Sequence, residues 1–386
     1  MRTKSIIFSF ITAIILFLIQ FPSSALAHNY SASYTDLKIE KDQTIMKFSL
    51  DTISVIELIP GIDKNKNYLL EKSEIKSGRH HLEELITERL ALDKNNIEQT
   101  PKLEKMKLVK KTNNIFLTCY LIYPSFSPGE NISLTDGLYS GDSGTTNYVN
   151  LLTATYQGEV SETALQGKDR TWTMLLTENQ QEQQTMDGQN SQSHSEEPAQ
   201  KNTSKSSSSW LSFLKLGIFH ILTGYDHLLF LFALLISRQT IKQYIGTITA
   251  FTIAHSITLT LSVLGIVSIP SYLVEAMIAL SICYVALENI FKKKINYRWA
   301  ITFTFGLIHG MGFASLLKDM NLPKSNLAVA LINFNLGIEF IQLMIVLLLI
   351  PVLLKLQKSM KYQRYMQIGS GIIFILGFIW LIQRLF

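Results

Sequence analysis

Apolar residues gather into long runs in the second half of the chain. Six runs are present, at residues 211–236, 244–264, 272–291, 299–317, 327–354 and 368–385. Each has close to the ~20 residues that a helix needs to cross the hydrocarbon core of a bilayer. Because backbone polar groups cannot stay unpaired in lipid, such runs indicate helices. We therefore expect an α-helical membrane domain of six transmembrane helices over residues 210–386.

The first half of the chain has a different pattern, in which polar and apolar residues alternate. Residues 30–50 alternate in the manner of a β-hairpin, and residues 115–123 and 148–156 are further strand candidates. Residues 72–92 are charged and have helical spacing. This pattern predicts a mostly β, sandwich-like domain over residues 28–176 that carries a short helical insertion.

Two further segments complete the organisation. Residues 1–27 have Arg2 and Lys4, an apolar stretch and an Ala-Leu-Ala ending, which is typical of a signal peptide. The helix-breaking Pro22 favours cleavage over an uncleaved membrane anchor. Residues 177–209 are rich in Gln and Ser and offer little apolar surface to bury, so they indicate a disordered linker.

The loop charges predict the orientation in the membrane. If the N-terminal domain is exported, the first, third and fifth loops face the cytoplasm, where Lys and Arg accumulate. These three loops carry Arg238, Lys242, Lys292, Lys293, Lys294, Arg298, Lys355, Lys358, Lys361 and Arg364. The second loop has no charge. We therefore expect a multi-pass protein of the cell membrane whose N-terminal domain lies on the extracytoplasmic side.

The overall composition limits the classes of binding partner and metal site that we expect. The chain is 47% hydrophobic and 17% charged, and its net charge is only +5. Basic residues are not interleaved with aromatic ones, so nucleic acid is not an expected partner, and the sequence leaves any protein partner unknown. Cys119 and Cys283 lie in different halves without CxxC neighbours, which argues against a disulfide or a thiolate metal site. Membrane lipid is the expected surrounding.

Ionisable residues inside the apolar runs carry the candidate chemistry. A charged side chain at the bilayer centre costs at least ~2.5–3.5 kcal/mol, so each needs a reason to be there. The runs contain His220, Asp226, His227, His255, Glu275, Glu288, His309 and Glu339. No Lys or Arg lies centrally to pair with the acids. Protonation or a bound metal ion is therefore expected to balance their charge.

The spacing of these residues suggests a shared site. His220 and His227 are seven residues apart and would share a helix face, with Gly224 between them. Asp226 would point elsewhere and support a ligand on another helix. Imidazole with carboxylate suits Ni, Co, Zn or Fe. Two alternatives use the same residue types, namely a proton relay and simple hydrogen bonding between helices.

Several blocks of sequence resemble a known family. Residues 220–230 read His-Ile-Leu-Thr-Gly-Tyr-Asp-His-Leu-Leu-Phe, which resembles the HxxxGxDHxxF signature of the HupE/UreJ family, in its exported-domain branch. Blocks around His255, Glu288, His309 and Glu339 resemble further family blocks in the same order. The resemblance implies a hydrogenase or urease accessory protein and an inferred nickel or cobalt permease. The second histidine and close glutamate of the nickel members are absent beside His309.

A separate motif in the N-terminal domain has the spacing of a calcium loop. Oxygen-bearing residues occupy loop positions 1, 3, 5, 9 and 12. They are Asp63, Asn65, Asn67, Glu71 and Glu74. Position 6 is Tyr68, where the sharp turn favours glycine, so an empty turn is the alternative to Ca²⁺ binding.

These observations support three hypotheses. The first is a permease in which His220, His227, His255 and His309 bind the ion, with Asp226, Glu339 and Glu288 ligating it or balancing its charge. The second is an intramembrane zinc-dependent hydrolase of a lipid-linked ester or amide, in which Ser256 or Ser281 polarises the carbonyl. The third is a non-catalytic anchor or sensor. The sequence leaves open whether the protein is an enzyme.

Overall fold

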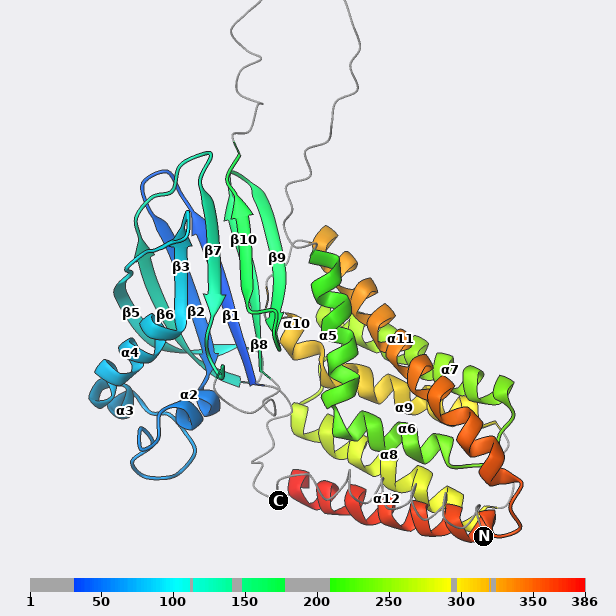
Figure 1. Ribbon diagram of the computed structural model, residues 1–386. Coiled ribbons are helices and arrows are strands. Elements are labelled where there is room, and N and C mark those ends of the chain that lie inside the picture. Colours follow the sequence, from blue (N-terminus) through cyan, green and yellow to red (C-terminus); the bar gives the residue numbers. More distant parts are fainter. Residues whose placement is uncertain are drawn as a thin grey trace, which may run out of the picture. The chain divides into compact units, whose positions relative to one another are not determined.

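The computed structural model describes residues 31–111, 114–140, 148–177, 209–292, 297–318, 320 and 324–385. The predicted signal peptide and nearly all of the predicted linker lie outside these residues. The described chain forms two compact units (Figure 1). The β unit comprises Ser31–Leu216 and Ser315–Phe334, and the membrane unit comprises Gly217–Ala314 and the chain from Asn335 onward.

The β unit contains a sheet of six strands in the order β5-β6-β2-β1-β8-β9. Its strands are β1 (Ser31–Ile39), β2 (Thr44–Asp51), β5 (Lys102–Lys111), β6 (Asn114–Tyr123), β8 (Tyr148–Tyr156) and β9 (Glu159–Gln166). β1 pairs antiparallel with β2, with Leu37 opposite Met46, and parallel with β8. The hairpin expected over residues 30–50 is therefore confirmed.

A second sheet of four strands has the order β10-β7-β3-β4. Its strands are β3 (Leu90–Lys94), β4 (Ile97–Glu98), β7 (Asn131–Asp136) and β10 (Thr171–Leu175). The helices of this unit are α2 (Thr52–Leu58), α3 (Lys72–Ser77) and α4 (Arg79–Arg89). The expected helical insertion is present and ends at Arg89, after which the chain enters β3.

Both sheets contribute to one apolar core. Leu37 and Phe48 from the first sheet and Leu134 and Trp172 from the second are almost fully buried in the same cluster. The Trp172 indole nitrogen donates to Ser161 Oγ at 3.0 Å, so its polar edge is also satisfied. The mostly β prediction for this half of the chain is confirmed, while a sandwich-like arrangement stays a prediction.

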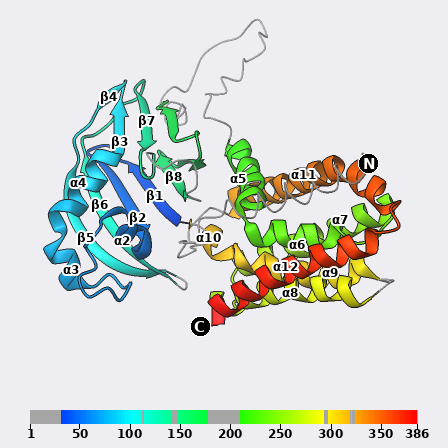
Figure 2. The same cartoon turned by 60° about the horizontal axis from the view of Figure 1, so that its bottom comes forward.

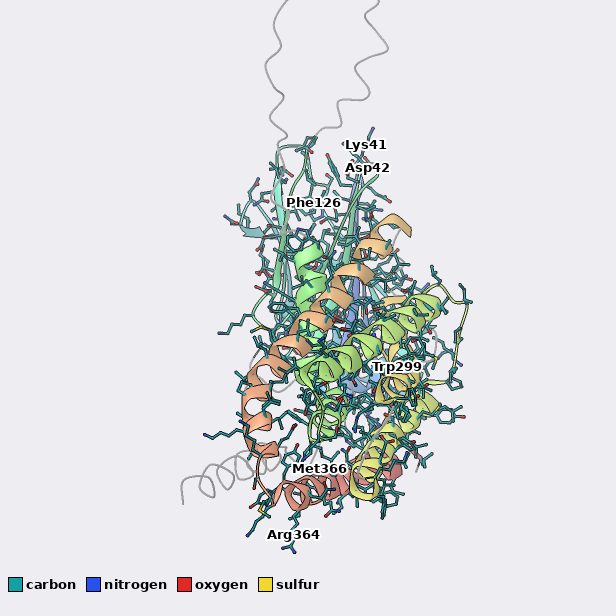
Figure 3. All side chains as sticks on the ribbon, turned by 90° about the vertical axis from the view of Figure 1, so that its right-hand side faces the viewer. Lys41, Asp42, Phe126, Trp299, Arg364 and Met366 are labelled. Atoms are coloured by element: carbon teal, nitrogen blue, oxygen red, sulfur yellow. The ribbon has the colours of Figure 1, made fainter. Side chains whose placement is uncertain are left out.

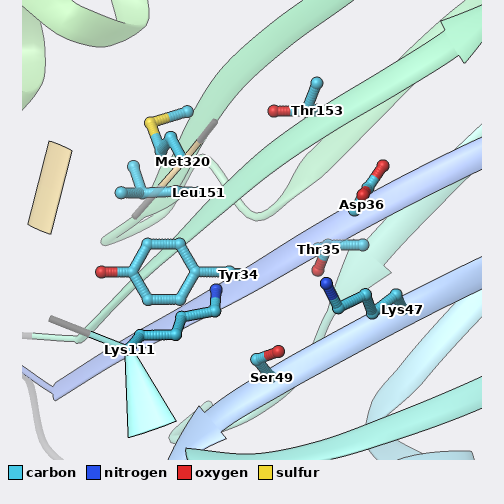
Figure 4. Close-up of a pocket in the computed structure, with 9 residues that line it drawn as sticks. All are labelled: Tyr34, Thr35, Asp36, Lys47, Ser49, Lys111, Leu151, Thr153 and Met320. Atoms are coloured by element: carbon cyan, nitrogen blue, oxygen red, sulfur yellow. The ribbon is translucent and has the colours of Figure 1, made fainter. Parts of the chain in front are cut away.

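A small pocket lies beside the first sheet of the β unit (Figure 4). Asp36 and Lys47 face each other across β1 and β2 there, and the Lys111 amine lies 4.1 Å from the centre of the Tyr34 ring. The Tyr34 hydroxyl donates to the Leu316 carbonyl at 3.1 Å. Neither histidine nor cysteine lines this pocket, so we look elsewhere for a transition-metal site.

A polar network is buried inside the β unit around Asp136. Its carboxylate accepts hydrogen bonds from the Tyr148 hydroxyl at 2.7 Å, the Asn150 amide at 2.9 Å and the Leu138 backbone N–H at 2.9 Å. Burial nevertheless raises the pKa of Asp136, because desolvation penalises its charged form more than these donors favour it. Folding therefore favours the protonated carboxyl.

This network makes the stability of the β unit depend on pH. Because the folded pKa of Asp136 exceeds its unfolded value, the stability it contributes is complete below the unfolded pKa and is lost as pH rises through the folded pKa. We expect the urea midpoint of the β-sheet circular dichroism signal to fall over this pH window, and the fall to be smaller in Asp136→Asn. Asp42→Asn, at the exposed tip of the β1–β2 hairpin (Figure 3), is the matched control. An identical pH profile in wild type and Asp136→Asn would contradict this account.

The remaining secondary-structure elements of the described chain are helices (Figure 2). They are α5 (Ser209–Thr223), α6 (Tyr225–Leu235), α7 (Ile241–Val263), α8 (Ser271–Phe291), α9 (Arg298–Gly312), α10 (Ala314–Lys318), α11 (Lys324–Gln357) and α12 (Tyr362–Leu385). By length and composition, α7, α8, α11 and α12 can each cross a membrane. The pair α5–α6, bent by 69°, adds a fifth span if it is counted as one.

The fourth apolar run differs most from expectation. Residues 299–317 were expected to form one span, but they fold as α9, of 15 residues, followed by the short α10. A 15-residue helix is only about 22 Å long, which is shorter than the ~30 Å hydrocarbon core. The described residues therefore show four or five candidate spans.

Candidate metal centre

A break in a helix positions the first two histidines. The seven-residue spacing predicts one continuous helix, along which His220 and His227 would be separated by roughly 10 Å. Instead, α5 ends at Thr223, Gly224 caps α6, and the two helices meet at an angle of 69°. The bend brings the two imidazole centroids to 4.6 Å. The expectation of a shared face on one helix is thus wrong, but the proximity it implied is present.

Gly224 is the residue that makes this break sterically possible. A Cβ atom at this position would lie 2.5 Å from the His220 carbonyl oxygen and 3.1 Å from His227 Nδ1. Asp226 Oδ1 would be 3.2 Å away. No other residue type fits so close to the backbone without displacing the histidines.

Two more histidines complete the cluster from other helices. Ligand atoms of His220, His227 and His255 all lie within 4.8 Å of one another. The His309 ring centre is 5.1 Å from that of His227. Nitrogens bound to one tetrahedral ion at 2.0–2.1 Å are about 3.4 Å apart, so modest ring rotations would bring these side chains onto an ion. Four helices, α5, α6, α7 and α9, therefore contribute one imidazole each.

Hydrogen bonds select the tautomers of two of these rings. His227 Nδ1 lies 2.9 Å from Asp226 Oδ1, and His309 Nδ1 lies 2.9 Å from the Phe305 carbonyl. Both contacts are satisfied when Nδ1 carries the proton and donates it, which leaves a lone pair on Nε2. The two Nε2 atoms are buried and accept no hydrogen bond from the described residues. A neutral imidazole with a free, oriented Nε2 is the form that binds a metal ion.

The Asp226 contact corrects an expectation. Asp226 was expected to point away and support a ligand on another helix. It instead pairs with its neighbour His227, since the helix begins anew at Tyr225 and both side chains lie in its first turn. The role in orienting a ligand is retained, but the ligand is on the same helix.

Aromatic side chains enclose the histidines. The centre of the Phe313 ring is 4.4 Å from that of His220, and the Phe230 ring centre is 4.9 Å from that of His309. Phe251 lies 5.1 Å from His309 by the same measure. All four imidazoles are at most 7% exposed. This setting excludes water and strengthens any electrostatic interaction with a bound charge.

Glycines on α9 place His309 in the cluster. At Gly306, an added Cβ would lie 2.6 Å from the Phe251 carbonyl oxygen, and at Gly310 it would lie 2.2 Å from the His255 carbonyl oxygen. These two positions are one turn apart, so their face of α9 contacts the α7 backbone directly. His309 therefore lies beside α7 because its neighbour Gly310 has no side chain.

The remaining acids have other partners. Thr249 Oγ1 donates to Glu339 at 3.1 Å, and Glu288 forms an ion pair with Lys292 at 3.1 Å. Glu275 pairs with Arg384 at 3.0 Å. The expectation that no cation pairs with these acids is therefore wrong for two of them, because Lys292 and Arg384 lie at helix ends and reach back. A direct ligand role for Glu288 or Glu339 stays a prediction.

Polar side chains on α11 lie against α7. Thr252 donates to Gln342 Oε1 at 3.1 Å, in addition to the contact between Thr249 and Glu339. These two contacts place polar side chains of both helices between α7 and α11.

A protein-family model matches the part of the chain that contains the histidine cluster. Residues 196–384 match the model described as HupE / UreJ protein. The membrane half of the chain belongs to the HupE/UreJ family. The match includes all four clustered histidines, while β1 to β10 lie outside it. A search of curated proteins found no match for the chain.

The HupE/UreJ half offers a defined donor set. Four neutral imidazoles and one nearby carboxylate suit a divalent ion of intermediate softness, such as Ni²⁺, Co²⁺ or Zn²⁺. Sequence reasoning named these five residues but missed the Phe305 carbonyl, which fixes His309, and Phe313, which covers His220. The sequence spacing carried a signal for the Phe305 carbonyl, because it lies one helical turn before His309 and is therefore close to that side chain.

Proposed function

We propose that this protein is a permease whose transported substrate is a divalent transition-metal ion. Ni²⁺ and Co²⁺ are the first candidates. The observation that carries the proposal is the histidine cluster at the break between α5 and α6. Substrate sites of secondary transporters commonly lie at discontinuous helices near the middle of the bilayer. Membership of the HupE/UreJ family supports the same reading.

Each residue has a role under this proposal. His220, His227, His255 and His309 bind the ion through neutral imidazole nitrogens. Asp226 orients His227 and offsets part of the positive charge. The ion then leaves between α7 and α11, along the polar side chains that lie between these two helices. Glu339 is the next carboxylate after Asp226 on that path. Glu288, paired with Lys292, is a less direct contributor to charge balance.

The proposal includes a topology. The bent pair α5–α6 is the first span, and α9 with α10 is the short fourth one, which gives six spans in total. The Lys- and Arg-rich loops then face the cytoplasm, and the β unit lies on the extracytoplasmic side. Since the chain carries no phosphate-binding loop, transport is secondary or channel-like.

The test is metal flux through the purified full-length protein. Vesicles containing the protein and a trapped metal-sensitive dye are expected to take up Ni²⁺ or Co²⁺ faster than protein-free vesicles. Mg²⁺, which prefers oxygen ligands, is expected not to compete. A flux equal to that of protein-free vesicles for every transition metal tried would overturn the proposal.

The structure gives the hydrolase alternative less support. Ser256 Oγ donates to the Thr252 carbonyl at 2.7 Å, and Ser281 Oγ donates to the Ile278 carbonyl at 2.6 Å. Both hydroxyls are thus occupied by their own helices rather than directed at a substrate. Zn²⁺ that stays bound through dialysis without any flux would favour a resident metal and revive this alternative.

Asp226→Asn is expected to weaken metal binding by about 10- to 100-fold, which is typical when a carboxylate behind a metal-bound histidine is removed. The amide is isosteric, but it can present a donor to His227 Nδ1 and removes a negative charge near the ion. Equilibrium dialysis with Ni²⁺ checks this, with Glu275→Gln, whose carboxylate pairs with Arg384, as a control for charge elsewhere in the membrane unit. Equal affinities for wild type and Asp226→Asn would contradict it.

A further inference from the structure

We infer that the loop between α2 and α3 of the β unit is a Ca²⁺ site, independent of the histidine cluster and of the proposed transport. The loop runs from Asp63 to Glu74, and its last three residues form the first turn of α3. Hydrogen bonds orient the side-chain oxygens of the loop, and one carboxylate oxygen lacks a hydrogen-bond partner among the described residues.

Asp63 supplies the decisive observation. It is only 9% exposed, and its Oδ1 atom is buried without a hydrogen-bond partner among the described residues. Its other oxygen, Oδ2, accepts from the Tyr68 backbone N–H at 2.9 Å, so the carboxylate points into the loop. A buried, unsatisfied carboxylate oxygen is unfavourable, and a cation in the loop would satisfy it.

The next two candidate ligands are held in the same way. Asn65 Oδ1 accepts from the Asn67 N–H at 3.1 Å, and Asn67 Oδ1 accepts from the Leu69 N–H at 2.8 Å. Each oxygen is thereby turned back toward the interior of the loop. Together with Asp63, these are loop positions 1, 3 and 5 of a calcium-binding turn.

Glu71 and Glu74 close the other side of the loop. Glu74 is 4% exposed and accepts from the backbone N–H groups of Lys64, at 2.8 Å, and Glu71, at 3.0 Å. Its carboxylate therefore lies between the beginning and the end of the loop, as the acid at position 12 must. Glu71 reaches over the loop, where the Asn67 side-chain amide donates to it at 3.3 Å.

The turn at position 6, which the sequence left open, forms in the structure, and the residue at position 8 holds the loop in place. Tyr68, at the position that favours glycine, adopts the left-handed conformation with φ of 60°, so the sharp turn forms without a glycine. Leu70, at position 8, is 5% exposed and packs in the core of the β unit. The loop is thus anchored with its oxygens arranged before any ion arrives.

The chemistry of the donors selects the ion. All the candidate ligands are oxygens, from carboxylates, amides and the Leu69 carbonyl at position 7, which suits Ca²⁺ rather than Ni²⁺ or Co²⁺. Only three of the ligand residues are acidic, and three lysines, Lys64, Lys66 and Lys72, lie within the loop. We therefore expect weak binding, with a dissociation constant of about 10⁻⁴–10⁻³ M, as in extracellular calcium modules.

The experiment is calorimetric titration of chelator-treated, full-length protein in detergent with CaCl₂. One Ca²⁺ per chain is expected for wild type, and at least 10-fold weaker binding for Asp63→Asn, whose size is unchanged. Glu83→Gln, an equal change of charge on the exposed face of α4, is expected to bind as wild type does. Circular dichroism spectra check that the variants are folded.

Three outcomes would overturn the inference. They are no heat of binding from wild type at millimolar Ca²⁺, equal affinity in Asp63→Asn, and equal weakening by Glu83→Gln. Folding of Asp63→Asn is checked by a second measurement, in which added Ca²⁺ is expected to raise the thermal midpoint of wild type and leave that of the variant unchanged. A rise of the same size in both proteins would count against the loop.

Discussion

Replacing His227 with alanine is expected to reduce Ni²⁺ or Co²⁺ uptake to the level of protein-free vesicles. His227 is the central member of the cluster, since its ring lies 4.6 Å from His220, 6.2 Å from His255 and 5.1 Å from His309. It also holds the contact with Asp226, so its loss removes a ligand and leaves the carboxylate without its partner. The measurement is the initial rate of dye response in vesicles.

The controls separate lost binding from lost folding. His81→Ala removes an exposed histidine on α4 of the β unit and is expected to leave uptake unchanged. His227→Gln keeps a polar side chain at the site, and a symmetric size-exclusion peak for either His227 variant shows that the protein is folded. Uptake at the wild-type rate by folded His227→Ala would remove the cluster from the transport pathway.

Replacing Gly310 with leucine is expected to prevent α9 from packing on α7. Even the first added carbon would lie 2.2 Å from the His255 carbonyl oxygen and 2.3 Å from Thr258 Oγ1. The carbonyl is backbone and cannot rotate away, so the helices must separate, at a cost of about 3 kcal/mol or more. We expect little monodisperse protein after solubilisation and no metal uptake from what remains.

The matched control is Gly371→Leu on α12, where an added Cβ meets nothing within 4 Å. It makes the same change of size in a membrane helix and is expected to preserve both yield and uptake. Gly310→Ala should give an intermediate result, because it adds only the first clashing atom. Wild-type yield and uptake from Gly310→Leu would show that this helix contact is dispensable.

The sequence predicted elements best where one physical rule dominated. The cost of unpaired backbone in lipid made α7, α8, α11 and α12 visible as apolar runs. β5 was missed because lysines dominate it, and an edge strand is where such lysines are tolerated. Hydropathy gives no sign that residues 299–317 divide into two helices, since both parts are apolar.

The sequence predicted which residues form the candidate site better than it predicted how they are arranged. The energetic cost of ionisable groups in a bilayer identified the four histidines that the structure brings together. The partners of the acids depend on the direction in which each side chain leaves its helix. A new helix begins after Gly224, and this directs Asp226 toward His227. No spacing rule for a continuous helix could anticipate that, nor the reach of Lys292 and Arg384 toward Glu288 and Glu275.

The adjacency of Asp226 and His227 has an electrical consequence for the proposed transport. Because the two residues are joined by one peptide bond and by a hydrogen bond, a rotation of α6 about Gly224 would carry a ligand and its counter-charge together. A divalent ion beside one carboxylate presents a net charge of one to the membrane field rather than two. Each unit of charge is worth ~2.3 kcal/mol per 100 mV, so voltage would act on the loaded site about half as strongly as on the bare ion.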